Sequence, residues 1–115
     1  PGYLPFVQNS QINEVVYKNM LKYCKPEQIK KGSKSIAASD LGDVSAFVPS
    51  IEFGYGGFKG AAHSKDVEII DENKVYIETS KLVIDIVSDL LQDKALYKAI
   101  NKSFKSRISK KDYKK

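Results

Sequence analysis

The most informative stretch of the chain is SDLGDVS at residues 39–45, which reads Ser39-Asp40-Leu41-Gly42-Asp43-Val44-Ser45. It is followed by a short apolar run, by the glycine-rich sequence GYGGFKG at residues 54–60, and then by His63. That histidine is the only one among the 115 residues. Because a single imidazole is too little for catalysis by itself, we interpret the stretch as one part of a larger site.

Length and composition limit the class of protein. The chain has 115 residues, of which 42% are hydrophobic, which suits one globular domain at most. No apolar run approaches the roughly 20 residues that span a bilayer, and no signal-peptide pattern opens the chain. The single Cys24 cannot form an internal disulfide, in agreement with a reducing compartment. We expect a soluble, cytoplasmic protein without a membrane partner.

The net charge of +5 is concentrated near the end of the chain. Residues 101–115, NKSFKSRISKKDYKK, are rich in lysine and contain one acidic residue, Asp112. A run of this kind is usually a solvated, frayed helix end, so nucleic acid is not the expected partner. The alternative is a small basic module that contacts nucleic acid or an acidic protein through this lysine-rich tail.

Two amphipathic helices are predicted. The first follows Ser10, which can cap it, and Pro26 limits its extension. The second is capped by Asp71 and runs to about Leu91. A polar stripe of this second helix is predicted to face water: Lys74, Glu78, Lys81, Asp85 and Asp89. Its wider apolar face must lie on a sheet or on another chain, because exposing it would be severely unfavourable.

The segments between these helices are short. We predict a loop at residues 25–35 that can include a turn of helix at 27–31. An extended segment at 35–38 and a brief helical turn at 44–48 that Pro49 ends are predicted to follow. Residues 51–55 are predicted to form a buried strand, and the glycines after it a loop. These elements are too few to cover all the apolar faces. We therefore predict an α/β fold in which helices pack on a mixed sheet whose other strands lie outside this chain.

A resemblance to a known family rests on residues 35–104. It is carried by SDLGDVS, by the extended Pro49-Ser50-Ile51-Glu52-Phe53, by the glycine loop with His63-Ser64, and by the long helix ending at Asp89-Leu90-Leu91. These residues resemble the carboxy-terminal segment of the aminoacylase-type metal-dependent amidohydrolases. That family includes glutamate carboxypeptidases, N-acyl amino acid deacylases and aminobenzoyl-glutamate hydrolases.

The resemblance implies that the chain is an incomplete fragment of a mixed-sheet, zinc-peptidase-like catalytic domain. Residues 1–9 would be a hinge returning from a missing lid domain. Residues 10–106 would be the carboxy-terminal part of the catalytic domain, and residues 107–115 a basic tail. The complete enzyme would be a homodimer.

The same resemblance implies a metal site. In these enzymes the histidine after the glycine loop ligates one of two divalent metal ions, and His63 stands at that position. Zinc is the first expectation, with manganese, cobalt or nickel as alternatives, because a neutral imidazole suits all of them. The other ligands and the glutamate base come from the amino-terminal half of such enzymes. We therefore expect no catalytic residue in this chain, and no activity from it alone.

Two aspartates and two glycines precede His63 in the sequence and are further candidates for the site. Asp40 is expected to orient a metal ligand without touching the metal, and Asp43 to be structural, although the spacing of the two fits a capped turn equally well. The backbone N–H groups of Gly56 and Gly57 could line the substrate pocket, and a purely conformational role for these glycines is an equal alternative.

The implied activity is that of a hydrolase, a metallopeptidase or aminoacylase in the broad sense. The complete enzyme would hydrolyse the amide bond of small N-acyl or aminobenzoyl amino acids or of dipeptides. Its partner would be a small-molecule amide substrate. A degenerate relative that is kept for assembly instead of chemistry is a third interpretation.

Overall fold

Helices make up most of the structure, a computed structural model in which residues 2–32 and 39–113 are described. In chain order the elements are α1 (Ser10–Met20), η1 (Pro26–Gln28), α2 (Leu41–Phe47), β1 (Phe58–Lys59), β2 (Glu68–Ile69), η2 (Asn73–Glu78), α3 (Thr79–Gln92), α4 (Lys94–Ser103) and α5 (Lys110–Tyr113). The strands form an antiparallel pair in which Phe58 lies opposite Ile69. The extended segment expected at 35–38 lies outside the described residues.

The first predicted helix is confirmed as α1, but its cap differs from the prediction. The side chain of Asn9, not of Ser10, accepts a hydrogen bond from the Ile12 N–H at 3.0 Å. Asn9 has extended backbone angles, which leave its amide oxygen free to reach the first turn. After α1, the expected turn at 27–31 is instead a 3₁₀ turn that begins at Pro26, because proline is tolerated at the first helical position.

The long second helix is confirmed and begins as predicted. The Asp71 side chain accepts a hydrogen bond from the Lys74 N–H at 2.9 Å, which is the expected cap. The first turns, η2, are π-helical, and the helix continues as α3. It ends where Asp93 caps a further helix, α4, by accepting from the Leu96 N–H at 2.8 Å. This last helix was missing from the prediction.

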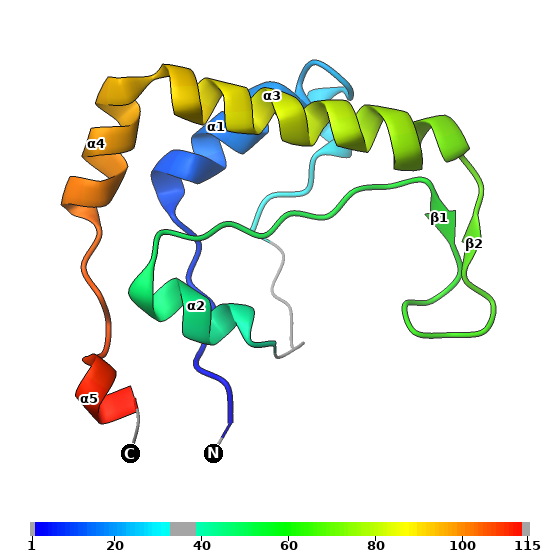
Figure 1. Ribbon diagram of the computed structural model, residues 1–115. Coiled ribbons are helices and arrows are strands. Elements are labelled where there is room, and N and C mark those ends of the chain that lie inside the picture. The colour runs from blue at the N-terminus through cyan, green and yellow to red at the C-terminus, as the bar shows by residue number, and fades with distance from the viewer. Residues whose placement is uncertain (1, 33–38, 114–115) are drawn as a thin grey trace.

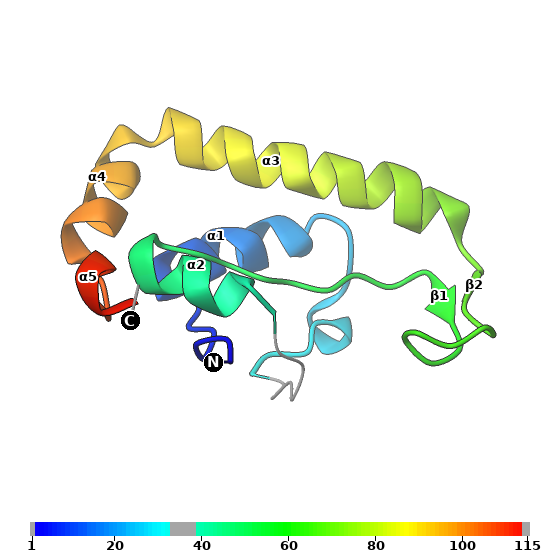
Figure 2. The same cartoon turned by 60° about the horizontal axis from the view of Figure 1, so that its bottom comes forward.

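The arrangement has one long helix with the other elements below it and at its ends (Figures 1 and 2). Helix α3 lies beside α1, while α4 turns away at one end of α3 and the β1–β2 hairpin lies at the other. The core is formed between α1, α3 and α4 by Ile12, Val15, Val16, Leu82, Ile86 and Ile100. The brief helical turn expected at 44–48 is present as part of α2.

The predicted strand at 51–55 has no sheet partner among the described residues. Ile51 and Phe53 pack partly buried on the α1–α3 core, whereas Glu52 and Gly54 are exposed, which is the alternation of a strand. Yet none of the hydrogen bonds between described residues is donated by a backbone N–H of residues 51–56. The segment therefore runs as an extended segment without a neighbouring strand among the described residues (Figure 1). The mixed sheet stays a prediction.

The radius of gyration reflects this openness. It is 16.3 Å for the Cα atoms, whereas a compact domain of this length has a value of about 13 Å. The core is correspondingly small, and many large apolar side chains are exposed, including Ile70 and Leu91. The chain closes well around α1 and α3 but leaves its hairpin and one side of α3 uncovered.

Candidate functional site

His63 lies in the loop that joins β1 to β2, and the residue is exposed. It is the third residue of a turn closed by a 3.1 Å hydrogen bond from the Ser64 N–H to the Ala61 carbonyl. Its φ of +63° is the only positive value at a described non-glycine residue. Histidine is one of the few side chains that tolerate this left-handed conformation. Its imidazole takes no part in the hydrogen bonds between described residues, so both ring nitrogens are free for a ligand.

The two aspartates of the SDLGDVS stretch have different environments. Asp43 accepts from the Leu4 N–H at 2.8 Å and from the Tyr113 hydroxyl at 2.9 Å. It thus ties both ends of the described chain to α2, in agreement with a structural role. Asp40 is exposed and precedes α2 without capping it through its side chain. Helix α2, which Asp40 directly precedes, lies apart from the β1–β2 hairpin whose loop contains His63 (Figure 1).

Gly57 is required by the backbone at the base of the hairpin. Its φ is +103°, and a Cβ at this position would overlap the Val75 side chain of η2. Its carbonyl accepts from the Ile70 N–H at 2.9 Å and also from Asp71. These contacts give Gly57 a conformational role. Gly56 is exposed, and a Cβ there would meet only the Lys74 side chain at ordinary contact distance.

The described part of the chain does not hold a complete metal site. Within residues 2–32 and 39–113, no group of three or more His, Cys, Asp or Glu side chains is placed to hold a metal ion. Two shallow hollows lie elsewhere, one between α1 and the start of α4 and one between the N-terminal segment and residues 103–107. Neither is lined by a candidate site residue. The described residues thus do not fit a complete two-metal site by themselves.

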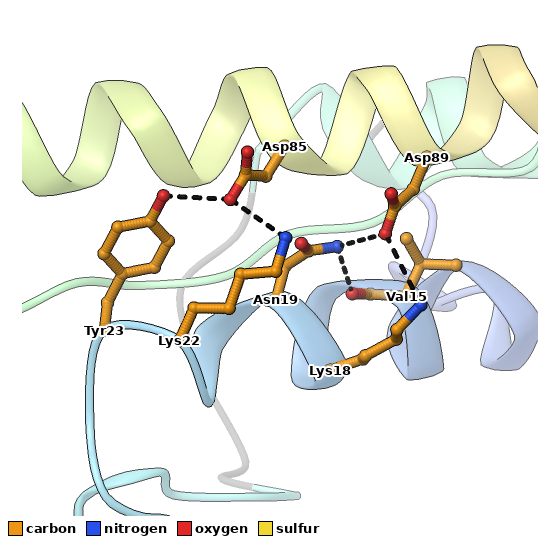
Figure 3. A network of polar contacts seen from close by, with 7 residues as sticks. All are labelled: Val15, Lys18, Asn19, Lys22, Tyr23, Asp85 and Asp89. Carbon is orange, nitrogen blue, oxygen red and sulfur yellow. Dashed lines mark hydrogen bonds and ion pairs between the residues drawn. The ribbon is translucent and has the colours of Figure 1, made fainter.

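The polar contacts between α1 and α3 correct one prediction. Asn19 is fully buried, and its Nδ2 donates to the Val15 carbonyl at 3.0 Å and to Asp89 at 2.9 Å (Figure 3). Lys18 adds an ion pair to Asp89 at 3.9 Å, which contributes little because the Lys18 side chain is 77% exposed and the two charged groups are far apart for a direct contact. The stripe predicted to face water is therefore wrong at Asp89, which instead faces α1.

Asp85, one helical turn before Asp89, also contacts residues just after the end of α1 instead of facing water. It accepts from Lys22 at 3.1 Å and from the Tyr23 hydroxyl at 2.9 Å (Figure 3). The hydrogen bonds from Lys22 and Tyr23 lower the pKa of Asp85 below its usual value. Burial and the hydrogen bond to Asp85 raise the pKa of the Tyr23 hydroxyl. These contacts fix the register of α1 on α3.

The buried Asn19 carries one unmet requirement. Its Oδ1 has no hydrogen-bond partner among the described residues. A buried acceptor without a partner costs about 1–3 kcal/mol, and this penalty lowers the stability gained when α1 packs on α3. The signal for this network was present in the sequence, because Asn19 stands among apolar residues on the inward stripe of α1.

Arg107 forms a second structural cluster in the region expected to be a basic tail. Its Nη2 donates to the Pro5 carbonyl at 2.8 Å, to Ser45 Oγ at 3.0 Å and to the Gly42 carbonyl at 3.3 Å. Nearby, Tyr113 stacks edge-on against Phe47 with 5.2 Å between ring centroids. Arg107 and Tyr113 remain exposed, but these contacts tie this part of the expected tail to Pro5 and to α2.

A close approach of two backbones explains Gly42 in the SDLGDVS stretch. A Cβ there would overlap the carbonyl oxygen of Leu4, so only glycine lets the N-terminal segment lie against α2. Ser45, almost fully buried, accepts from the Val7 N–H at 3.2 Å and donates to the Gly42 carbonyl at 2.8 Å. Part of this stretch therefore serves packing of the chain ends.

Comparison with other proteins identifies no family for this chain. Within the described residues, no helix has the length and apolar content needed to cross a membrane. No protein-family model matches the chain, and no curated protein or solved structure was found to be similar to it.

Proposed function

We propose that the chain contributes a metal ligand, His63, to the catalytic domain of a metal-dependent amidohydrolase, which is completed by further polypeptide. The proposed domain has the α/β mixed sheet with helices packed on it, binds two divalent ions such as zinc, and acts on small amide substrates in the cytoplasm. The enzyme would be a homodimer, and the chain alone inactive.

The observation that carries this proposal is the state of His63. The imidazole is exposed, has no hydrogen-bond partner among described residues, and stands in a turn that holds its backbone at a positive φ. A metal ligand needs a free ring nitrogen and a fixed position. The hairpin supplies both, and the hydrogen bonds that the Gly57 carbonyl accepts from Ile70 and Asp71 anchor its base.

The open segment at 51–56 supports the larger domain. Its backbone N–H groups have no partners among the described residues, while Ile51 and Phe53 already pack on the core. An extended backbone with one packed face and free N–H groups is suited to accept a neighbouring strand. A strand added here would extend a sheet beside the hairpin that carries His63.

The test uses the complete enzyme and the substitution His63→Asn. Asparagine tolerates the same left-handed backbone but lacks the imidazole. We expect less metal retained per chain after dialysis, measured by elemental analysis, and loss of hydrolysis of N-acyl and aminobenzoyl amino acids. Ser64→Ala, next to it in the loop, is the control and should keep its metal. Unchanged metal content in His63→Asn would remove the ligand assignment.

A further inference from the structure

Helix α3 and η2 carry a second apolar stripe, apart from the one that faces the core. Its members are Tyr76, Ile77, Val83, Ile84, Val87 and Leu91, which are between 44% and 71% exposed. By contrast, Leu82 and Ile86 on the core side are 6% and 5% exposed. In both overall views no described element lies over the side of α3 away from α1 (Figures 1 and 2).

The spacing of this stripe is that of a helix-pairing seam. Ile77, Ile84 and Leu91 recur every seven residues, and Ser80 and Val87 follow the first two after three. A repeat of this kind places one continuous row of side chains along a helix, as in two-stranded coiled coils. No charged residue stands within the row from Ile77 to Leu91.

We propose that this stripe binds the same stripe of a second copy of the chain, with the two α3 helices antiparallel. In that orientation Ile84 of one copy lies against Val87 of the other, and the small Ser80 lies against the large Leu91. The seam is then aliphatic except at Ser80, its one small position. The row is self-complementary, as a two-fold interface requires.

The exposed area suits a weak dimer. Six half-exposed side chains of this size offer on the order of 600 Å² per copy, slightly less than the roughly 800 Å² per partner of a standard interface. We therefore expect a dissociation constant in the roughly micromolar range. The stripe points away from α1 and does not include residues 51–56, so the inference does not depend on the proposed enzymatic function.

Analytical ultracentrifugation of the chain between about 1 and 300 µM tests the proposal. The unsubstituted chain should pass from monomer to dimer over this range. Ile84→Asp should weaken the dimer at least about 100-fold, because it places a charge in the centre of the seam. Ala99→Asp adds the same charge at an exposed position of α4 and should leave the dimer unchanged. Circular dichroism checks that both variants keep their helices.

A gain of affinity provides a second readout that misfolding cannot imitate. Ser80→Leu fills the one small position of the seam and should tighten the dimer several-fold or change its register, with the helix content unchanged. A chain that stays monomeric throughout the range would overturn the proposal. So would a dimer insensitive to both Ile84→Asp and Ser80→Leu, or open-ended aggregates, since a two-fold contact closes on itself.

Discussion

The α1–α3 pair and the β1–β2 hairpin differ in how far their side chains are buried and hydrogen-bonded by other described parts of the chain. The helix pair buries a set of aliphatic side chains and joins its polar edge by direct hydrogen bonds between Asn19 and Asp89 and between Tyr23 and Asp85. The hairpin has exposed residues at all four strand positions, and the imidazole of His63 in its loop forms no hydrogen bond with any residue of the described ranges 2–32 and 39–113.

The difference indicates which part of the chain stands by itself. The helix pair has what a folded unit needs, namely a cluster of buried aliphatic side chains and polar contacts at its edge that set the register. The hairpin and the neighbouring segment at 51–56 have backbone and side-chain groups available for something else to bind. Substitutions should therefore affect stability in the first region and recognition in the second.

The largest expected effect is in the helix pair. Ile86→Ala removes a side chain that is 5% exposed and should destabilise the chain by about 2–5 kcal/mol, measured by urea unfolding. Ile69→Ala in β2, where the residue is 40% exposed, is the matched change in the hairpin and should cost less than about 1 kcal/mol. Equal losses at the two positions would break the distinction between the regions.

A buried charge tests the polar edge of the same pair. Asn19→Asp places a second carboxylate within hydrogen-bond distance of Asp89 and removes a donor, so we expect a loss of about 1–3 kcal/mol at pH 7. The loss should shrink in acid, where the carboxyl groups share a proton. Asn13→Asp, on the exposed side of α1, is the control. A variant as stable as the parent would mean that Asn19 does not face Asp89.

The pH dependence of stability tests Asp85. Because hydrogen bonds from Lys22 and Tyr23 hold the pKa of Asp85 below its ordinary 3.8, its ionised form is favoured by folding. Its contribution is fully present above that value and is lost as the pH falls through the lower pKa of the folded chain. Unfolding followed from pH 7 to pH 2 should show a smaller acid-induced loss in Asp85→Asn. Asp66→Asn, in the exposed hairpin loop, should match the parent.

The smallest effect is expected at His63 and has the opposite sign. In His63→Gly the left-handed backbone no longer carries the steric strain of a Cβ, while the unfolded chain gains conformational entropy. The relief of strain is the larger effect, so the hairpin should become more stable by about 0.5–1 kcal/mol. Amide hydrogen exchange of residues 58–59 and 68–69 measures this local stability. A hairpin that becomes less stable would show that the imidazole makes contacts in solution that bind it to the rest of the chain.

Local patterns predicted the two main helices but not their orientation. The spacing of apolar residues and the cap at Asp71 were sufficient for α3, since both are local features. They could not place Asp85 and Asp89, because the partners Asn19, Lys22 and Tyr23 lie more than 60 residues away in sequence. The boundary before α4 was readable, because Asp93 precedes KALYKAI as a cap.

The candidate site was less predictable than the fold. The role of His63 came from a resemblance, and the geometry of one exposed imidazole does not select a metal. The conformational demand at Gly57 was foreseen as one of two alternatives, since dense glycines signal unusual backbone angles. The roles of Gly42 and Arg107 were not foreseen, because each depends on the approach of the chain ends, which no local pattern encodes.

The hydrogen bond from Arg107 to the Pro5 carbonyl joins residues that are 102 positions apart. Such a link can form only after Arg107 has left the ribosome, since synthesis proceeds from the amino terminus. Until then the N-terminal segment has α2 as its available support, through Leu4 and Asp43. The N-terminal segment therefore gains this contact only after the 102 positions that follow Pro5 have been synthesised, and the nascent chain must avoid aggregation until Arg107 emerges.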